Sequence, residues 1–164
     1  MVTAKDVIKS SYNMVSMMVD SYTKDLGDDD LKLIPVPGMN TIGWQIGHLI
    51  SSEHRIVEGL KPGSSPPLPE GFEVVHGKDK GHAEGAHALL SGDRYREIWA
   101  AQRAATLKVL DEMIDADLDK PTEGSMASFA PTGAAMIALP ASHTLMHLGQ
   151  FVAVRRYLNK PTAF

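Results

Sequence analysis

The sequence predicts an all-α protein, an antiparallel four-helix bundle with a long insertion between its second and third helices. Apolar residues recur at helical spacing over four stretches of roughly 20 to 27 residues. Outside the insertion, no stretch of useful length alternates apolar and polar residues as a half-buried strand would. Two short connectors and one long crossover join the four stretches. With 164 residues, the chain can bury a core, and we expect one domain over residues 1–164.

The first predicted helix covers residues 3–26. Its apolar positions recur near helical spacing: Val7, Ile8, Met14, Val15, Met18 and Val19. Gly27 is expected to end the helix, because glycine accepts the left-handed conformation that often follows a helix end. Residues 28–39 then form a connector, since they contain Pro35, Pro37 and Gly38.

The second predicted helix begins at Asn40 or Thr41, either of which can cap it, and ends near Leu60. The insertion of residues 61–88 follows. It starts with KPGSSPPLPEG, and its apolar anchors are Phe72, Val74 and Val75. A loop this long in a small domain is usually functional or folded as a lid. We therefore expect a lid, with a mobile loop as the alternative.

The third predicted helix is capped by Ser91 and runs to about Asp117. A second loop, residues 121–131, separates it from the last helix. That helix begins at Thr132 and continues to about Leu158. It contains Pro140, which predicts either a kink or the first turn of a separate helix.

Composition excludes several classes of protein. The net charge is −4 and no run of Lys and Arg occurs, so we expect no nucleic-acid partner. The absence of cysteine excludes disulfides, thiolate metal sites and a cysteine nucleophile. No apolar stretch approaches the roughly 20 residues that span a bilayer, and the first residues lack a signal-peptide pattern. The expectation is a soluble, cytoplasmic protein without a membrane partner.

His143 and His147 are the sharpest local feature. Four residues apart on a helix, they share one face, with Cβ atoms about 6 Å apart, and two such imidazoles can grip one metal ion. Chance alone would supply about 0.3 such pairs, so the spacing by itself is weak. The pair lies on the helix's expected apolar stripe, with Met136, Leu139, Met146, Gln150, Phe151, Val154 and Leu158. Metal binding and two hydrogen-bonded core histidines both remain open.

A third ligand has to come from elsewhere, because residues 132–158 contain no Asp or Glu. His48, in the middle of the second helix, is the best candidate. It projects well over 90° from the centre of that helix's apolar stripe, so we expect it to face a second contact surface or a groove. His54 falls on a different side of the helix.

The other charged or titratable candidates have ordinary interpretations. The insertion histidines are expected to be solvated, with a fourth ligand or an acid–base group as the alternative; they are His76, His82 and His87. Solvated helix charges are expected at Glu53 and Glu58. Two cations suit the dipole at the end of the last helix, Arg155 and Arg156.

Several stretches resemble one family over nearly the whole chain. NTIGWQIGHLISSEHRIVEGL resembles the second helix of the DinB/YfiT-like superfamily of helical metalloproteins, which is unrelated to the DNA polymerase of the same name. ASHTLMHLGQFVAVRRYLNKPTAF resembles the family's ending, with a histidine pair, a GQ dipeptide and an arginine-bearing turn. LPEGF and DADLDKP match its middle. The family's four-helix bundle agrees with the fold expected above.

The resemblance implies that His48, His143 and His147 bind one divalent metal ion. Zinc or nickel suits imidazole best here, and manganese or iron is also compatible. Gln150 could orient His147 or a ligand through a hydrogen bond outside the metal's own ligands. No catalytic residue and no other cofactor can be identified.

The resemblance also implies a reaction class. Some family members look like transferases or isomerases that use low-molecular-weight thiols such as bacillithiol or mycothiol, and a homodimer is expected by analogy. Two alternatives stay open. One is a stress-related or dimer-forming helical module without catalysis, with or without metal. The other is a metal-dependent hydrolase, which would need a general base such as Glu53 or an insertion histidine.

Overall fold

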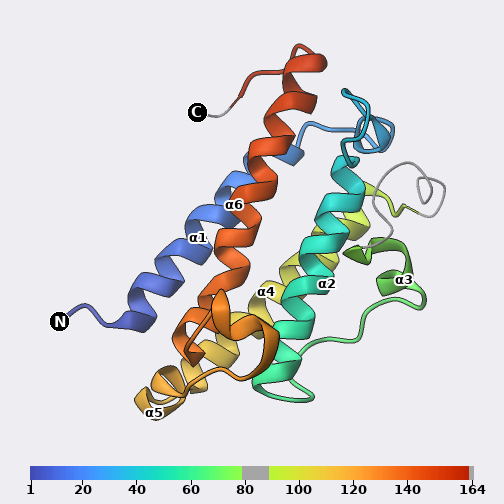
Figure 1. The fold of residues 1–164 in the computed structure, drawn as a ribbon. Coiled ribbons are helices and arrows are strands. Elements are labelled where there is room, and N and C mark those ends of the chain that lie inside the picture. The colour runs from blue at the N-terminus through green and yellow to red at the C-terminus, as the bar shows by residue number, and fades with distance from the viewer. Residues whose placement is uncertain (79–88, 163–164) are drawn as a thin grey trace.

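The computed structural model describes residues 1–78 and 89–162. These residues form helices joined by loops, and they contain no strand (Figure 1). The predicted all-α class is therefore confirmed for the described residues. The α-helices are α1 (Ala4–Thr23), α2 (Ile42–Leu60), α3 (Phe72–His76), α4 (Gly92–Glu112), α5 (Asp115–Asp119) and α6 (Gly133–Tyr157). None of them is long and apolar enough to cross a membrane.

Each of the four long helices begins with a hydroxyl cap. In each, the cap side chain accepts a hydrogen bond from the backbone N–H three residues later, and the caps are Thr3, Thr41, Ser91 and Thr132. Such a cap satisfies one of the N–H groups that have no partner inside the helix. The predicted starts at Thr41, Ser91 and Thr132 are thereby confirmed.

The end of α1 differs from the prediction. The helix stops at Thr23, and Gly27 is not among the residues with positive φ. Arg155 donates to the carbonyl oxygen of Tyr22 at 2.8 Å, and Lys160 donates to that of Asp25 at 2.7 Å. Side chains from the far end of the chain thus satisfy carbonyl groups where the helix ends, so no glycine cap is needed.

The third long helix, α4, is also shorter than predicted. It ends at Glu112, and the extended backbone of Met113 and Ile114 separates it from α5. The Asp117 carboxylate accepts the Ile114 N–H at 2.9 Å and caps the new helix. This bond favours a new helix start here, because an aspartate side chain competes with the helical pattern by binding a nearby backbone N–H.

The direction of the helices corrects the expected antiparallel bundle, because α2 and α4 run the same way (Figure 1). At one end Gly43 lies beside Tyr95, where both helices begin. At the other end Lys61 pairs with Glu112, where both end. The chain between α2 and α4 therefore returns to the end at which α2 began. A long crossover permits this order, whereas a short loop would force antiparallel neighbours.

The other contacts complete the arrangement. Helices α1 and α6 also run the same way, since Tyr12 bonds to Ile137 and Tyr22 to Arg155. Helices α2 and α6 are antiparallel, since Gln45 bonds to His147 whereas His48, later in α2, lies beside His143, earlier in α6. Helix α2 contacts α3, α4 and α6, and every residue from 41 to 51 is buried. Polar side chains on α2 therefore lie inside the protein.

Helix α6 is one continuous helix through Pro140, so the alternative of a separate helix is wrong. The Thr144 hydroxyl donates to the Pro140 carbonyl at 2.8 Å. The buried face of α6 is rotated from the predicted stripe: Met146 is 60% exposed, whereas the buried residues include Ile137, Ala141, Thr144, Leu148 and Phe151. His147 lies at the edge of this face, toward α2.

Candidate metal centre

The structure brings together the three histidines that the sequence singled out. His48 comes from α2, and His143 and His147 come from α6. One ring nitrogen from each lies within 4.8 Å of the other two. His48 and His147 are buried, and His143 is half-buried. Two antiparallel helices therefore build the group. His48 faces α6, which is the second contact surface expected for it.

The ring of His147 is held by Gln45, another side chain of α2. Its Nδ1 lies 2.9 Å from Gln45 Oε1. The Gln45 amide nitrogen donates to the Asn40 carbonyl at 2.9 Å, which fixes the orientation of the amide. Because an amide oxygen only accepts, the proton of neutral His147 lies on Nδ1. Its Nε2 lone pair is left for the centre of the group.

The ring of His48 is held by the insertion. Its Nδ1 donates to the backbone carbonyl of His76 at 3.0 Å, so its Nε2 also carries a free lone pair. Trp44 stacks on the ring with centroids 4.8 Å apart and an interplanar angle of 8°, and its indole N–H donates to the Val75 carbonyl at 3.0 Å. These carbonyls lie at the end of α3, where a helix leaves C=O groups without an internal partner.

Helix α3 corrects two expectations about the insertion. Residues 72–76 are helical rather than irregular, and His76 is 1% exposed rather than solvated. Its Nδ1 donates to the Phe72 carbonyl and its Nε2 accepts from the Tyr95 hydroxyl, each at 2.8 Å. A Cβ on Gly47 would lie 2.0 Å from the His76 ring. The bare backbone at Gly47 is thus what lets α3 lie against α2.

The donor set suits a metal ion. Nε2 of His143 and Nε2 of His147 are 3.2 Å apart. Two imidazole nitrogens on one tetrahedral zinc ion would be separated by roughly 3.3 Å, given Zn–N distances of about 2.05 Å. In metalloproteins, ligand histidines usually donate the other ring N–H to a carbonyl or carboxylate. His48 and His147 have such partners, so these residues fit a divalent ion.

Burial keeps these rings neutral. Burial lowers the pKa of His143 to about 4, with a further contribution from the charges of His48 and Arg55. Burial also lowers the pKa of His147 to about 3, aided by His143 and His48. The pKa of His48 is lowered by burial as well. Neutral imidazole is the form that binds a metal ion.

These shifts predict the pH dependence of the metal-free protein. The ordinary pKa is 6.5 and the folded values are lower, so between about pH 4 and 6.5 the unfolded chain binds more protons. The free energy of unfolding should therefore fall as pH drops through this window. Urea unfolding at several pH values, with a chelator present, measures this free energy. The His147→Gln variant should show a smaller change of unfolding free energy with pH. His54→Gln is the control, and an unchanged slope in His147→Gln would contradict the prediction.

Other predicted residues have different surroundings from those expected. Gln45, not Gln150, makes the hydrogen bond to His147. Glu53 is buried against Arg103 rather than solvated. Arg155 is 3% exposed and pairs with Asp25 at 2.6 Å, so it joins α6 to the end of α1. The remaining insertion histidines, His82 and His87, lie outside the described residues.

The sequence-based prediction missed Gln45, Gly47 and the burial of His76. The signal for Gln45 was an amide within an apolar helical run, three residues before His48. His76 follows the apolar anchors Phe72 and Val75, which is a weak sign of burial. For Gly47 no local signal distinguishes it from other helical glycines.

Comparisons with known proteins agree with this fold. The sequence model of the DinB superfamily matches residues 12–151. A crystal structure described as the conserved protein of locus from Enterococcus faecalis superposes with a TM-score of 0.75 at 16% identity, covering 97% of this chain and 99% of that chain. At this identity the likeness shows the fold alone. Curated proteins give no significant match.

Proposed function

The chain belongs to the DinB superfamily, and we propose that it is a metalloenzyme in which His48, His143 and His147 bind one divalent ion. The observation that carries the proposal is the convergence of three neutral imidazoles within 4.8 Å. Two of them have their outer nitrogens held by Gln45 and by the His76 carbonyl. Such support is typical of metal-binding histidines.

Three neutral ligands favour catalysis over a purely structural role. When bound, a divalent ion would keep its full charge and an open position, where it would act as a Lewis acid and lower the pKa of a thiol or of water. Arg55 adds positive charge at the site, since it contributes to the lowered pKa of His48 and His143. Glu73 lies 3.9 Å from Arg55 and offsets part of that charge, so attraction of an anionic substrate or cosubstrate would come mainly from the charge of the bound ion.

We propose transfer of a low-molecular-weight thiol to an electrophile as the reaction. The thiol loses its proton to solvent, its sulfur forms a bond to the electrophilic carbon, and the leaving group departs with the bonding pair. The chain has no cysteine, so the sulfur nucleophile would have to be a cosubstrate. Arg55 would attract a carboxylate on either reactant in competition with Glu73. Burial of His48 and His147 would limit the access of bulk water to their rings, whereas His143 is half-buried.

Removal of one histidine should abolish metal binding. The untagged protein should contain about one equivalent of zinc, nickel, manganese or iron by mass spectrometry. His147→Ala should lower this to background, because two imidazoles remain. Gln45→Leu should weaken binding roughly 10–100-fold, since it removes only the support for His147. His54→Ala is the matched control, and an untagged protein that takes up none of these ions would refute the site.

The thiol reaction has its own test. Metal-loaded protein is incubated with 1-chloro-2,4-dinitrobenzene and either bacillithiol, mycothiol, glutathione or no thiol, and chloride release is followed. The expected result is thiol-dependent turnover that His147→Ala abolishes. Hydrolysis of a model ester without any thiol, measured in parallel, would favour the hydrolase alternative. If neither activity is detected, the non-catalytic module is favoured. Light scattering tests the homodimer that the resemblance implies.

A further inference from the structure

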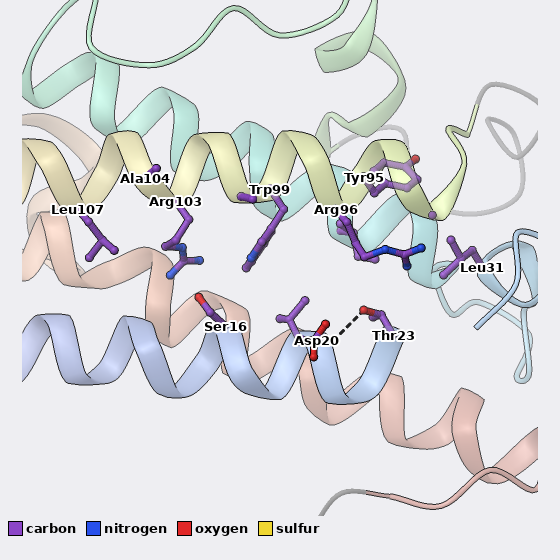
Figure 2. A pocket seen from close by; sticks show the side chains of 14 residues that line it. Ser16, Asp20, Thr23, Leu31, Tyr95, Arg96, Trp99, Arg103, Ala104 and Leu107 are labelled. Atoms are coloured by element: carbon purple, nitrogen blue, oxygen red, sulfur yellow. Dashed lines mark hydrogen bonds between the residues drawn. The ribbon is translucent and has the colours of Figure 1, made fainter. Parts of the chain in front are cut away.

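A second site lies between α1 and α4, away from the three histidines. The two helices form the sides of a half-open cavity of about 490 Å³ there, within the range of small-molecule sites. None of the three histidines lines it. Its walls are mostly apolar, including Val19, Ile46, Trp99 and Leu107. Figure 2 shows Trp99 and Arg103 projecting from α4 toward α1, with Ser16 opposite.

Three polar atoms of the residues that line this cavity lack hydrogen-bond partners within the described part of the chain. Arg103 is 6% exposed. Its Nη2 donates to Glu53 at 3.0 Å, but neither Nε nor Nη1 has a hydrogen-bond partner among the described residues. The buried hydroxyl of Ser16 also has none there. Buried donors without an acceptor are costly, at about 1–3 kcal/mol each. Both residues line the cavity, and the three unpaired atoms lie just behind its wall, so a small shift of the wall side chains would let an acceptor oxygen satisfy them.

The guanidinium of Arg103 is held firmly in place. It lies over the Tyr12 ring at 4.3 Å and the Trp99 ring at 4.8 Å from the centroids. Its charge is balanced by Glu53, so a ligand need not be an anion. The exposed rim carries one charge of each sign, Asp20 and Arg96. The cavity thus selects for hydrogen-bond acceptors on an apolar body rather than for net charge.

We propose that this cavity binds a small molecule with an apolar body and one acyl oxygen group, a carboxylate or a carboxamide, that accepts hydrogen bonds from Arg103 and Ser16. The apolar body would lie against Trp99, Leu107 and Val19. This site does not depend on the proposed metal centre, and its test uses protein kept metal-free with chelator. Carboxylate binding to a metal ion cannot then be mistaken for binding to the cavity.

The test uses three eight-carbon probes at pH 7.5: octanoate, octanamide and octylammonium. The chain has two tryptophans, so its indole N–H signals can be assigned with Trp44→Phe. Titration should shift the Trp99 signal with octanoate and octanamide. Octylammonium has no acceptor and should bind at least about tenfold more weakly, because a hydrogen bond to a charged donor is worth roughly that factor.

Variants confirm the location. Ser16→Leu should fill the cavity and abolish binding, whereas Ser10→Leu, on the exposed side of the same helix, should bind like the wild type. The double variant Glu53→Gln/Arg103→Met removes the donors without leaving an unpaired charge and should weaken both oxygen probes about tenfold. Circular dichroism confirms folding of each variant. The proposal is overturned if no probe shifts Trp99, if octylammonium binds as well as octanoate, or if the double variant binds like the wild type.

Discussion

The Arg103→Met variant is expected to lose about 3–5 kcal/mol of unfolding free energy at pH 7.5, because it leaves a buried carboxylate without its counter-charge. Glu53 is 2% exposed. It accepts from Arg103 at 3.0 Å and from the Thr106 hydroxyl at 2.6 Å. Methionine fills similar space but supplies no donor. Urea unfolding in the presence of chelator measures the loss without a contribution from bound metal.

The pH dependence of this loss identifies its cause. Burial already raises the pKa of Glu53, and Arg103 opposes that shift, so removing Arg103 should raise the pKa further. A carboxyl with a raised folded pKa gains stability as pH falls toward its unfolded pKa. The deficit of Arg103→Met relative to the wild type should therefore shrink between pH 7.5 and 5. Comparison at equal pH cancels the contribution of the buried histidines.

The double variant Glu53→Gln/Arg103→Met is the matched control for this prediction. Replacing both members of a buried pair is often close to neutral, so the double variant should recover most of the lost stability. A double variant as unstable as Arg103→Met would mean that the packing of the guanidinium between Tyr12 and Trp99, and not its charge, holds α4 against α1.

The Gly47→Ala variant is expected to damage the proposed metal site from outside it. The added Cβ would lie 2.0 Å from the His76 ring, so α3 must move away from α2. That movement removes the carbonyl of His76 from His48 and the carbonyl of Val75 from Trp44. We expect a loss of about 1–3 kcal/mol in unfolding free energy and a metal affinity lower by roughly 10–100-fold.

Gly59→Ala on the same helix is the control for Gly47→Ala. Nothing lies within 4 Å of a Cβ built at Gly59, so alanine there should stabilise the helix by roughly 0.5–1 kcal/mol. Calorimetric metal titration and urea unfolding of both variants compare the two positions. If Gly47→Ala bound metal as tightly as Gly59→Ala, the contact between α3 and α2 would have no role in the site.

Local sequence signals predicted the beginnings of the helices and one face of the site. The hydroxyl caps at Thr41, Ser91 and Thr132 mark helix starts because the bond they make is to a residue only three positions away. The His143 and His147 pair was recognisable for the same reason, since a helix sets the spacing of residues four apart.

The features that the sequence did not reveal depend on distant contacts. Glu53 looks like any helical carboxylate until Arg103, 50 positions later, lies beside it. His76 is buried where Gly47 and Tyr95, both distant in sequence, accommodate its ring. The direction of α4 depends on where the crossover ends, and no short stretch of sequence encodes that end. Burial and helix direction are properties of the assembled fold.

The hydrogen bond between Gln45 and His147 joins positions 102 apart in the sequence. An ion shared by α2 and α6 would therefore act as a crosslink that closes a loop of about a hundred residues. In the chain-entropy description of disulfides, closing a loop of that length restricts the unfolded ensemble by about 4.7 kcal/mol. That restriction would last only while the ion stays bound to residues of both helices, so it would disappear when the ion is removed by a chelator.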